Sequence, residues 1–221
     1  MKKLKDYPTH IISYKNLDYP QKLKNIKRFP VCLFYKGNIN ILNNKTLAII
    51  GSRKYSEYGK NVAIEMAYHL AKEGFTIVTG GARGIDSFAN IGANKAKKPS
   101  VIVLGNGLDY IYPPENKELE EEVLNNDGLI ITEFFNDIRG NKYTFPNRNR
   151  IISGLSDGVL VVEAKEKSGT AITVDYALDQ GRDIYSIPGS VLEENCNGTN
   201  NLIKQGAKLV TSIQDIIEDF L

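Results

Sequence analysis

The chain has 221 residues, of which 42% are hydrophobic and 24% charged, with a formal net charge of +2. This length can bury a core without disulfides, and the low net charge excludes a globally basic protein, so any nucleic-acid signal must be local. Cys32 and Cys196 lie far apart without a CxxC motif, and no apolar run reaches the roughly 18–20 residues that cross a bilayer. We therefore expect a cytoplasmic protein without a disulfide framework, a zinc site or a membrane span.

Residues 1–44 mix Lys, Asn, Pro and Tyr and predict a small N-terminal cap, with a short helix and one or two strands around Cys32–Tyr35. From Thr46 onward, apolar β-rich runs alternate with helical patterns. These runs are TLAII (46–50), FTIVT (75–79), SVIVL (100–104), GLIIT (128–132), GVLVVEA (158–164) and DIYSIP (183–188). Continuous apolar strands separated by helices indicate strands buried on both faces. Residues 45–221 are therefore predicted to form a doubly wound α/β fold with a mainly parallel sheet.

Helical patterns lie between most of these runs. In YGKNVAIEMAYHLAKEG the apolar Val62, Met66 and Leu70 fall on one face, and Gly74 supplies a stop signal. PENKELEEEVLNN, SGTAITVDYALDQG and the tail TSIQDIIEDF are predicted as further helices.

The loops that follow the first two strands of 45–221 carry glycines and arginines. In such a sheet, ligands bind beyond the carboxyl ends of the strands. Glycines there permit tight turns and let backbone N–H groups approach a phosphate at a helix N-terminus. The candidate phosphate-binding residues are Gly51, Ser52 and Arg53 after the first strand, and Gly80, Gly81 and Arg83 after the second. We interpret Asp86 in TGGARGID as a cap that holds its own loop.

Positive charge gathers in the loop predicted after the fourth strand, TEFFNDIRGNKYTFPNRNR. Between Ile138 and Ser156 there is no Asp or Glu, and the stretch contains Arg139, Lys142, Tyr143, Phe145, Arg148 and Arg150. Cations attract phosphates, and rings offer stacking faces to unpaired bases. The combination favours single-stranded nucleic acid or a nucleotide over a duplex. Alternatively, Arg148 and Arg150 are internal partners of buried carboxylates such as Glu133 or Glu163.

Motifs for other chemistries are missing from the sequence. GxGxxG is absent after the first strand and GxxxxGK[ST] is absent throughout, which argues against a dinucleotide cofactor and P-loop ATP hydrolysis. His10 and His69 have no credible nucleophile or base beside them in the pattern. We therefore expect no cofactor, no metal and no catalytic residues.

Eight segments taken in order resemble the motif string of the DprA (Smf) DNA-processing family. They are IIGSR, TGGARGID, LGNGLDYIYPPEN, TEF, FPNRNRIISGLSDGVLVVEA, SGTAIT, GRDIYSIPGS and GTNNLIKQGAKLV. The resemblance covers residues 17–211 and implies an extended Rossmann-like fold that binds single-stranded DNA, forms homodimers and passes the DNA to the RecA recombinase in natural transformation. Many family members also carry a longer SAM-like domain and a winged helix, whose DNA contacts are not expected in this chain.

The resemblance also implies roles for particular residues of the DNA pocket. Arg53 and Lys142 correspond to its cations, and Phe145 corresponds to the ring beside a base. Arg148 and Arg150 match the two arginines of the family's FPxRNR motif.

A self-association region is implied for the segment from Asn200 to Leu209. GTNNLIKQGA is predicted as a helix, and Leu202, Ile203 and Leu209 are apolar groups that a homodimer near this end of the sheet would cover. Alternatively, these side chains pack inward on their own sheet.

Two other functions use a similar pocket. Lysine-decarboxylase-like phosphoribohydrolases share a related core but carry a PGGxGTxxE signature, whereas this chain reads EAKEKSGTAIT, with no PGG and no glutamate after the GT. A nucleotide-sensing module is the other alternative, because a pocket for a phosphate and a base serves both kinds of ligand.

Overall fold

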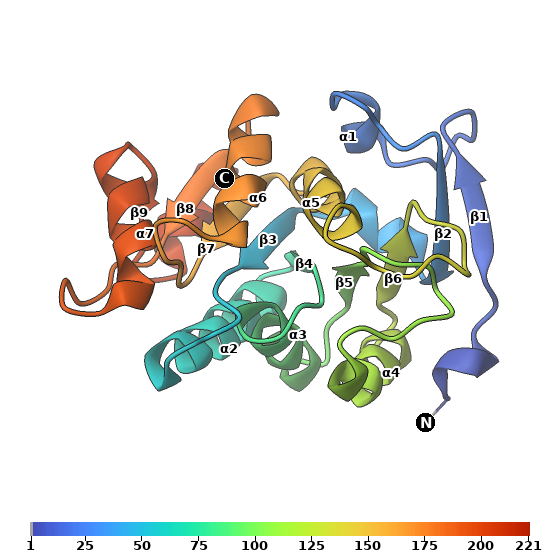
Figure 1. The fold of residues 1–221 in the computed structure, drawn as a ribbon, viewed down its shortest axis with the longest axis horizontal. Helices are drawn as coiled ribbons and strands as arrows, with labels where there is room; N and C mark the ends of the chain where they lie inside the picture. Colours follow the sequence, from blue (N-terminus) through green and yellow to red (C-terminus); the bar gives the residue numbers. More distant parts are fainter. Residues whose placement is uncertain (1) are drawn as a thin grey trace.

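A nine-stranded sheet organises residues 2–221, the part of the chain that the computed structural model describes (Figure 1). The strands are β1 (His10–Ser13), β2 (Cys32–Gly37), β3 (Thr46–Ile50), β4 (Thr76–Thr79), β5 (Ser100–Val103), β6 (Leu129–Thr132), β7 (Gly158–Val161), β8 (Asp183–Ser186) and β9 (Lys208–Leu209). All six apolar runs predicted from the sequence are strands. Every residue of β3 to β7 is buried, as expected for strands covered on both faces.

The spatial order of the strands is β1-β2-β6-β5-β4-β3-β7-β8-β9. Strands β3 to β9 are parallel, and β2 joins β6 in the antiparallel sense. The chain adds strands in one direction from β3 to β6 and in the other direction from β7 to β9. The order therefore reverses between β3 and β7, where doubly wound sheets place their ligand crevice. The predicted fold class is confirmed.

The N-terminal segment extends this same sheet. Phe34 of β2 pairs with Thr132 of β6, and β1 pairs antiparallel with β2. The short helix and the strand predicted in this segment are α1 (Gln21–Lys24) and β2. Residues 2–44 thus add two strands at the β6 side of the sheet.

Helices cover both faces of the sheet (Figure 1). The α-helices are α2 (Glu57–Lys72), α3 (Ile85–Lys95) and α4 (Lys117–Asn125) on one face, α5 (Thr144–Leu155) and α6 (Gly169–Asp179) on the other, and α7 (Glu194–Lys204) and α8 (Gln214–Ile217) towards the C-terminus. Short 3-10 helices are η1 (Leu4–Asp6), η2 (Ile39–Asn43), η3 (Pro114–Asn116) and η4 (Glu218–Phe220). Helix α2 ends before Gly74, whose φ of 90° favours glycine. Within residues 2–221 no helix is long and apolar enough to span a membrane.

The predicted loop after the fourth strand is wrong for TFPNRNR, because these residues form the first turns of helix α5. The side-chain oxygen of Asn141 accepts hydrogen bonds from the backbone N–H groups of Tyr143 and Thr144, at 2.8 and 3.1 Å, and so satisfies two donors where the helix begins. Pro146 lies in the first turn, where its missing N–H costs nothing. The second half of the cation-rich stretch, with Arg148 and Arg150, is therefore part of a helix that packs on the sheet, and Arg139 and Lys142 precede it.

Candidate functional site

A pocket of about 360 Å³ opens at the point where the strand order reverses. It lies among the loop after β3, the start of α3, the first turns of α5, and the segment that leads from β7 into α6. Of the residues predicted from the sequence, the structure brings together in its lining Gly51, Ser52, Arg53, Phe145 and Arg148. These residues come from distant parts of the chain and meet because β3 and β7 are neighbours in the sheet.

The rim of the pocket is positively charged. Arg53 and Lys54 are exposed, and the half-buried Lys165 also lines the pocket while its ammonium group pairs with Glu194. Among the described residues that line the pocket, Asp86 supplies the one carboxylate, and it is buried beneath the loop after β4. The accessible charge around this pocket therefore favours an anion.

The N-terminus of α6 also faces the pocket. Ser168 immediately precedes the helix, and its hydroxyl is buried without a hydrogen-bond partner among residues 2–221. Gly169 has open space where a Cβ would be. The first backbone N–H groups of a helix lack internal partners and favour negative charge, and the orphan hydroxyl adds a donor. This corner of the pocket can hold a phosphate.

Sequence reasoning did not single out Lys54, Lys165 and Ser168. The available signal was a Ser-Gly-Thr sequence at the start of a predicted helix that follows a buried strand. It became informative only once the fold placed α6 beside the loop after β3.

The loop after β3 is held by the end of β7. The N–H of Ser52 donates to the carbonyl of Glu163 at 2.7 Å. The buried carboxylate of Glu163 accepts from the backbone N–H of Ser56 at 3.0 Å and from the Ser56 hydroxyl, at the beginning of α2. Glu163 therefore anchors α2. The alternative that it is the internal partner of Arg148 or Arg150 is wrong.

The glycines after β4 differ from expectation. The N–H of Gly80 donates to Asp86 Oδ2 at 3.0 Å, and the N–H of Gly81 donates to Thr79 Oγ1 at 3.1 Å. Both N–H groups are thus used inside the protein and are not free to bind a phosphate. Gly80 borders a small hollow next to the pocket, whereas Gly81 lies outside the lining of both.

Asp86 holds its own loop, as predicted. Besides the bond from Gly80, it accepts from the N–H of Ala82 at 3.4 Å. Burial raises the pKa of the Asp86 carboxyl, while the positive charge of Arg148 and these backbone N–H groups lower it. The carboxylate and the guanidinium flank Gly80, where an added Cβ would lie within 2.8 Å of each.

Arg148 is buried in spite of its charge. Its Nη1 donates to the carbonyl of Gly80 at 2.5 Å and to the carbonyl of Val103, and so ties α5 to the ends of β4 and β5. Burial lowers the pKa of Arg148 to about 10, against the opposing effect of Asp86. Arg148 therefore lines the pocket, but its hydrogen bonds are directed mainly to backbone carbonyls of the protein interior.

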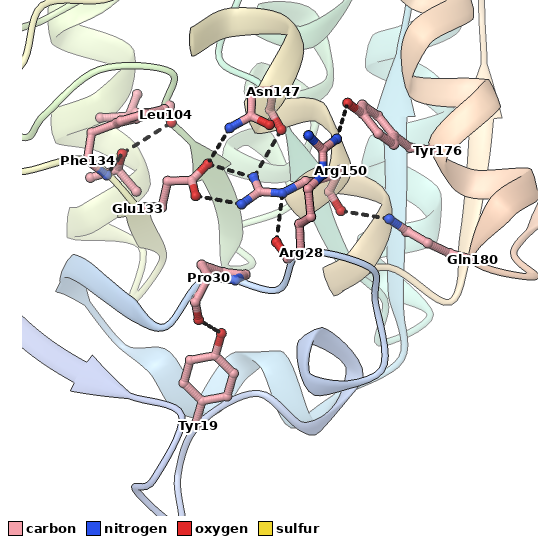
Figure 2. Close-up of polar contacts among 11 residues, drawn as sticks. Tyr19, Arg28, Pro30, Leu104, Glu133, Phe134, Asn147, Arg150, Tyr176 and Gln180 are labelled. Atoms are coloured by element: carbon pink, nitrogen blue, oxygen red, sulfur yellow. Dashed lines mark hydrogen bonds and ion pairs between the residues drawn. The ribbon is translucent and has the colours of Figure 1, made fainter.

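Arg150 forms an internal ion pair, which Figure 2 shows. Its Nη1 and Nη2 atoms each lie 2.6 Å from a different oxygen of Glu133, in a bidentate geometry. Nη1 also donates to the carbonyl of Asn147, and Nε donates to the carbonyl of Arg28, each at 3.0 Å. The pairing with Glu133 confirms the structural alternative for Arg150, and the guanidinium joins α5 to the N-terminal segment.

Phe145 lies at the border of the pocket. Its half-buried ring packs against Tyr112, with ring centroids 4.9 Å apart and an interplanar angle of 34°. Gly105 and Gly140 permit this packing, because a Cβ on either would lie within 2.5 Å of the ring. The ring therefore both anchors α5 and contributes an apolar surface to the pocket.

Lys142 and Arg83 lie outside the lining of the pocket. Lys142 is exposed, with its Nζ 5.1 Å from the centroid of the Tyr143 ring. The exposed Arg83 pairs with Glu115 through Nε and Nη2, and this hydrogen bonding and the charge of Glu115 raise the pKa of Arg83. Lys142 is available to a ligand on the surface, whereas Arg83 already has an anionic partner.

The predicted self-association residues occupy different environments. Leu202 packs against the core cluster beneath α5 and α6, and Ile203 is half-buried. The side-chain amide of Asn200 bonds both backbone groups of Gly189, at 3.1 and 3.0 Å. Leu209 is 46% exposed on β9, at the edge of the sheet. Inward packing therefore accounts for Leu202, while Leu209 remains open to a partner.

No group of three or more His, Cys, Asp or Glu side chains within residues 2–221 is arranged to hold a metal ion.

The fold and the pocket define a Rossmann-like α/β protein with a crevice, rimmed by exposed cations, where its strand order reverses. Residues 10–221 match the family described as DNA recombination-mediator protein A. The chain belongs to this family, the DprA/Smf DNA-processing proteins.

Individual relatives agree with this assignment. The chain is 42% identical to DNA processing protein DprA of Streptococcus pneumoniae over 210 residues, which cover 94% of this chain and 74% of that protein. The crystal structure of that relative has a TM-score of 0.90, with 40% identity, and the match covers 98% of this chain and 75% of the other. DNA processing protein A of Helicobacter pylori, described for a unique single-stranded DNA binding mode, has a TM-score of 0.85 at 31% identity and covers 96% of this chain and 95% of its own.

Proposed function

We propose that this chain binds single-stranded DNA in the pocket between β3 and β7 and acts without catalysis as a recombination mediator. The observation that carries the proposal is the joining of three features in one crevice: exposed cations at Arg53 and Lys54, the unpartnered Ser168 hydroxyl at the start of α6, and the ring of Phe145. Cations and helix N-termini bind backbone phosphates, and aromatic side chains take bases whose faces are exposed.

A hydrolytic function has weaker support. The carboxylate that lines the pocket, Asp86, is buried and occupied by two backbone N–H groups, so it is poorly placed to activate a water molecule. The PGG and the glutamate of the phosphoribohydrolase signature are also missing from the sequence. The site is therefore better suited to binding than to bond cleavage.

Binding of labelled oligo-dT and of a hairpin-free duplex, each at two salt concentrations, tests the proposal. We expect tighter binding of the single strand, because a duplex hides its base faces. Arg53→Ala should weaken binding, whereas the control Lys98→Ala, an exposed lysine in the turn between α3 and β5, should not. Equal affinities for single strand and duplex, or an Arg53→Ala protein that binds as the wild type does, would contradict it.

A mononucleotide is a second candidate ligand. The volume of about 360 Å³ and the orphan hydroxyl at the start of α6 suit a compact phosphate-bearing ligand. Competition with dTMP distinguishes the two: a DNA site releases oligo-dT only at a large excess of dTMP, whereas a nucleotide-sensing site binds the mononucleotide at least as tightly.

A homodimer that delivers DNA to RecA would complete this role. Leu209, exposed on the edge strand β9, supports self-association through this edge. Two linked pockets can raise the affinity for a long strand by on the order of 100-fold. Leu209→Arg should then give a folded monomer that binds short oligonucleotides normally and long ones weakly. Sedimentation of the wild type as a monomer at tens of micromolar would contradict the dimer. The mediator role would be contradicted if adding the wild-type protein does not change the rate at which RecA loads on DNA coated by single-strand-binding protein.

A further inference from the structure

The loops after β5 and β6 form one continuous surface beside the pocket. The N–H of Gly107 donates to the carbonyl of Ile138 at 2.8 Å, and the N–H of Asp109 donates to that of Asn136 at 3.2 Å. Gly107 allows this close approach, because a Cβ there would lie 2.0 Å from the carbonyl oxygen of Phe135. Side chains carried by the two loops are therefore held on one shared support.

This surface carries rings and a cation that the pocket does not use. Tyr112 is 48% exposed and packs against Phe145. The guanidinium of the exposed Arg139 lies 5.2 Å from the centroid of the Tyr110 ring, a cation–π arrangement. Stacking platforms and an adjacent cation are what a single strand requires.

The surface is continuous with the pocket. Tyr112 borders a small hollow together with Arg53, Phe145 and Arg148, and these last three also line the pocket itself. The hollow, of about 10 Å³, is too small for a base, so a base could reach Tyr112 only from the outer, exposed side of the ring.

We propose that Tyr112 and the Tyr110–Arg139 pair form a second nucleotide subsite, which binds the nucleotide next to the one in the pocket. The inference rests on the proposed binding of single-stranded DNA. The half-buried ring of Phe145 faces the pocket and already packs against Tyr112, so the exposed outer face of Tyr112 is the next stacking surface along the strand. Arg139 can remain stacked on a ring while it donates to a phosphate, because its guanidinium is planar and has several donors.

Charge on these loops limits how the subsite can work. Asp109 and Asp137 are also exposed on the two loops, so the surface is not broadly basic. Affinity there must come from stacking on Tyr112 and from one guanidinium. Loss of Tyr112 should leave the salt dependence of binding unchanged, whereas loss of Arg139 should reduce its slope by about 0.7, the value for one phosphate contact on a single strand.

A length series of oligo-dT binding to the full chain, followed by fluorescence anisotropy, tests the subsite. Tyr112→Ala should bind the shortest competent oligonucleotide as the wild type does and lose roughly 5- to 150-fold in affinity for longer ones. Tyr112→Phe should keep wild-type affinity, because the ring is retained. Arg139→Ala should show the same dependence on length, whereas Lys72→Ala, which removes a cation 5.0 Å from the Tyr68 ring on α2, should have no effect.

The outcomes separate this inference from the proposed function. If Arg53→Ala weakens binding at every length but Tyr112→Ala and Arg139→Ala bind as the wild type does, the second subsite is refuted and the pocket stands. An equal loss at every length in Tyr112→Ala would also refute it, because Tyr112 would then act through Phe145 in the pocket. If the wild-type protein binds no oligonucleotide, both ideas fail.

Discussion

Four of the five cations that the sequence singled out as ligands for phosphate fall into two groups in the structure, and the fifth, Arg83, is exposed but paired with Glu115. Arg53 and Lys142 are exposed and make no ion pair among residues 2–221, whereas Arg148 and Arg150 are buried and hydrogen-bonded. Three of the four lie within nine positions of one another, from 142 to 150. Clustering of charge along a sequence therefore does not establish a shared role, because the position of each side chain in the fold decides it.

The geometry of α5 explains the division. Arg148, Ile151 and Leu155 recur at intervals of three and four, and all are buried, so Arg148 occupies a position on the face that packs on the sheet. Lys142 precedes the helix and projects into solvent. Arg148 lines the crevice, Arg150 ties α5 to Glu133 and the N-terminal segment, and the exposed cations are the ones a ligand can reach.

Removing a buried arginine should have the largest effect. The side chains of Arg150 and Glu133 are only 5% and 15% exposed, so Arg150→Ala leaves the carboxylate of Glu133 largely buried without its partner. We therefore expect a loss of about 3–5 kcal/mol in the free energy of unfolding. Chemical denaturation followed by circular dichroism measures the loss. The double variant Glu133→Leu, Arg150→Met should recover much of it, because no unpaired charge remains. An Arg150→Ala protein with wild-type stability and weaker DNA binding would move Arg150 into the exposed group.

A buried carboxyl group without a salt bridge extends the comparison. Glu120 on α4 is buried and has no ion pair among residues 2–221, and burial raises the pKa of its carboxyl from 4.5 to about 8, although Lys36 opposes the shift. The folded state then binds more protons than the unfolded state between these two values. The stabilisation by protonated Glu120 is complete below the unfolded pKa and is lost as the pH rises through the folded pKa, with a slope of at most about 1.4 kcal/mol per pH unit.

Glu120→Gln should flatten this pH dependence, and Glu118→Gln, an exposed glutamate on the same helix, should leave it unchanged. Denaturation midpoints from about pH 5 to about pH 8 provide the measurement. Identical pH profiles for Glu120→Gln and the wild type would show that Glu120 is ionised in the fold.

Much of the fold was predictable, because the six strands are uninterrupted apolar runs and Gly74 ends α2 where expected. The addition of β1 and β2 to the sheet was not, since pairing of β2 with β6 depends on contacts between residues about a hundred positions apart. The helix α5 was missed because its start depends on the Asn141 side chain, and its buried face includes an arginine.

The candidate site was predictable in part. Arg53, Ser52 and Phe145 follow from loop positions and motifs, and the structure brings them into one pocket. Lys165 and Ser168 join them only because β7 lies beside β3, which no local pattern states. The expectation of free N–H groups at Gly80 and Gly81 failed because Asp86 and Thr79 occupy them.

Phe145 is half-buried, and it could act in packing, in base stacking or in both. Two variants separate these roles. If a base contacts the ring, Phe145→Ala should cost about 1–3 kcal/mol of binding free energy for oligo-dT. Phe145→Leu keeps most of the apolar volume against Tyr112 but removes the ring. Stacking predicts that both variants lose affinity, whereas a purely structural role predicts that Phe145→Leu retains both stability and affinity.

The smallest effects should come from the exposed cations, and their salt dependence measures which of them touch the DNA backbone. Arg53→Ala and Lys142→Ala should each reduce the slope of log affinity against log salt by about 0.7, and neither should change the stability of the fold. Arg83→Ala is the matched control, because its guanidinium is exposed but already paired with Glu115. We expect its slope to equal that of the wild type. An unchanged slope for Lys142→Ala alone would show that no phosphate contacts Lys142, which lies outside the lining of the pocket. An unchanged slope for Arg53→Ala would show that the strand does not place a phosphate on Arg53 in the pocket. Arg53 would then not belong to the ligand-binding cations, and the division into structural and ligand-binding cations would be wrong.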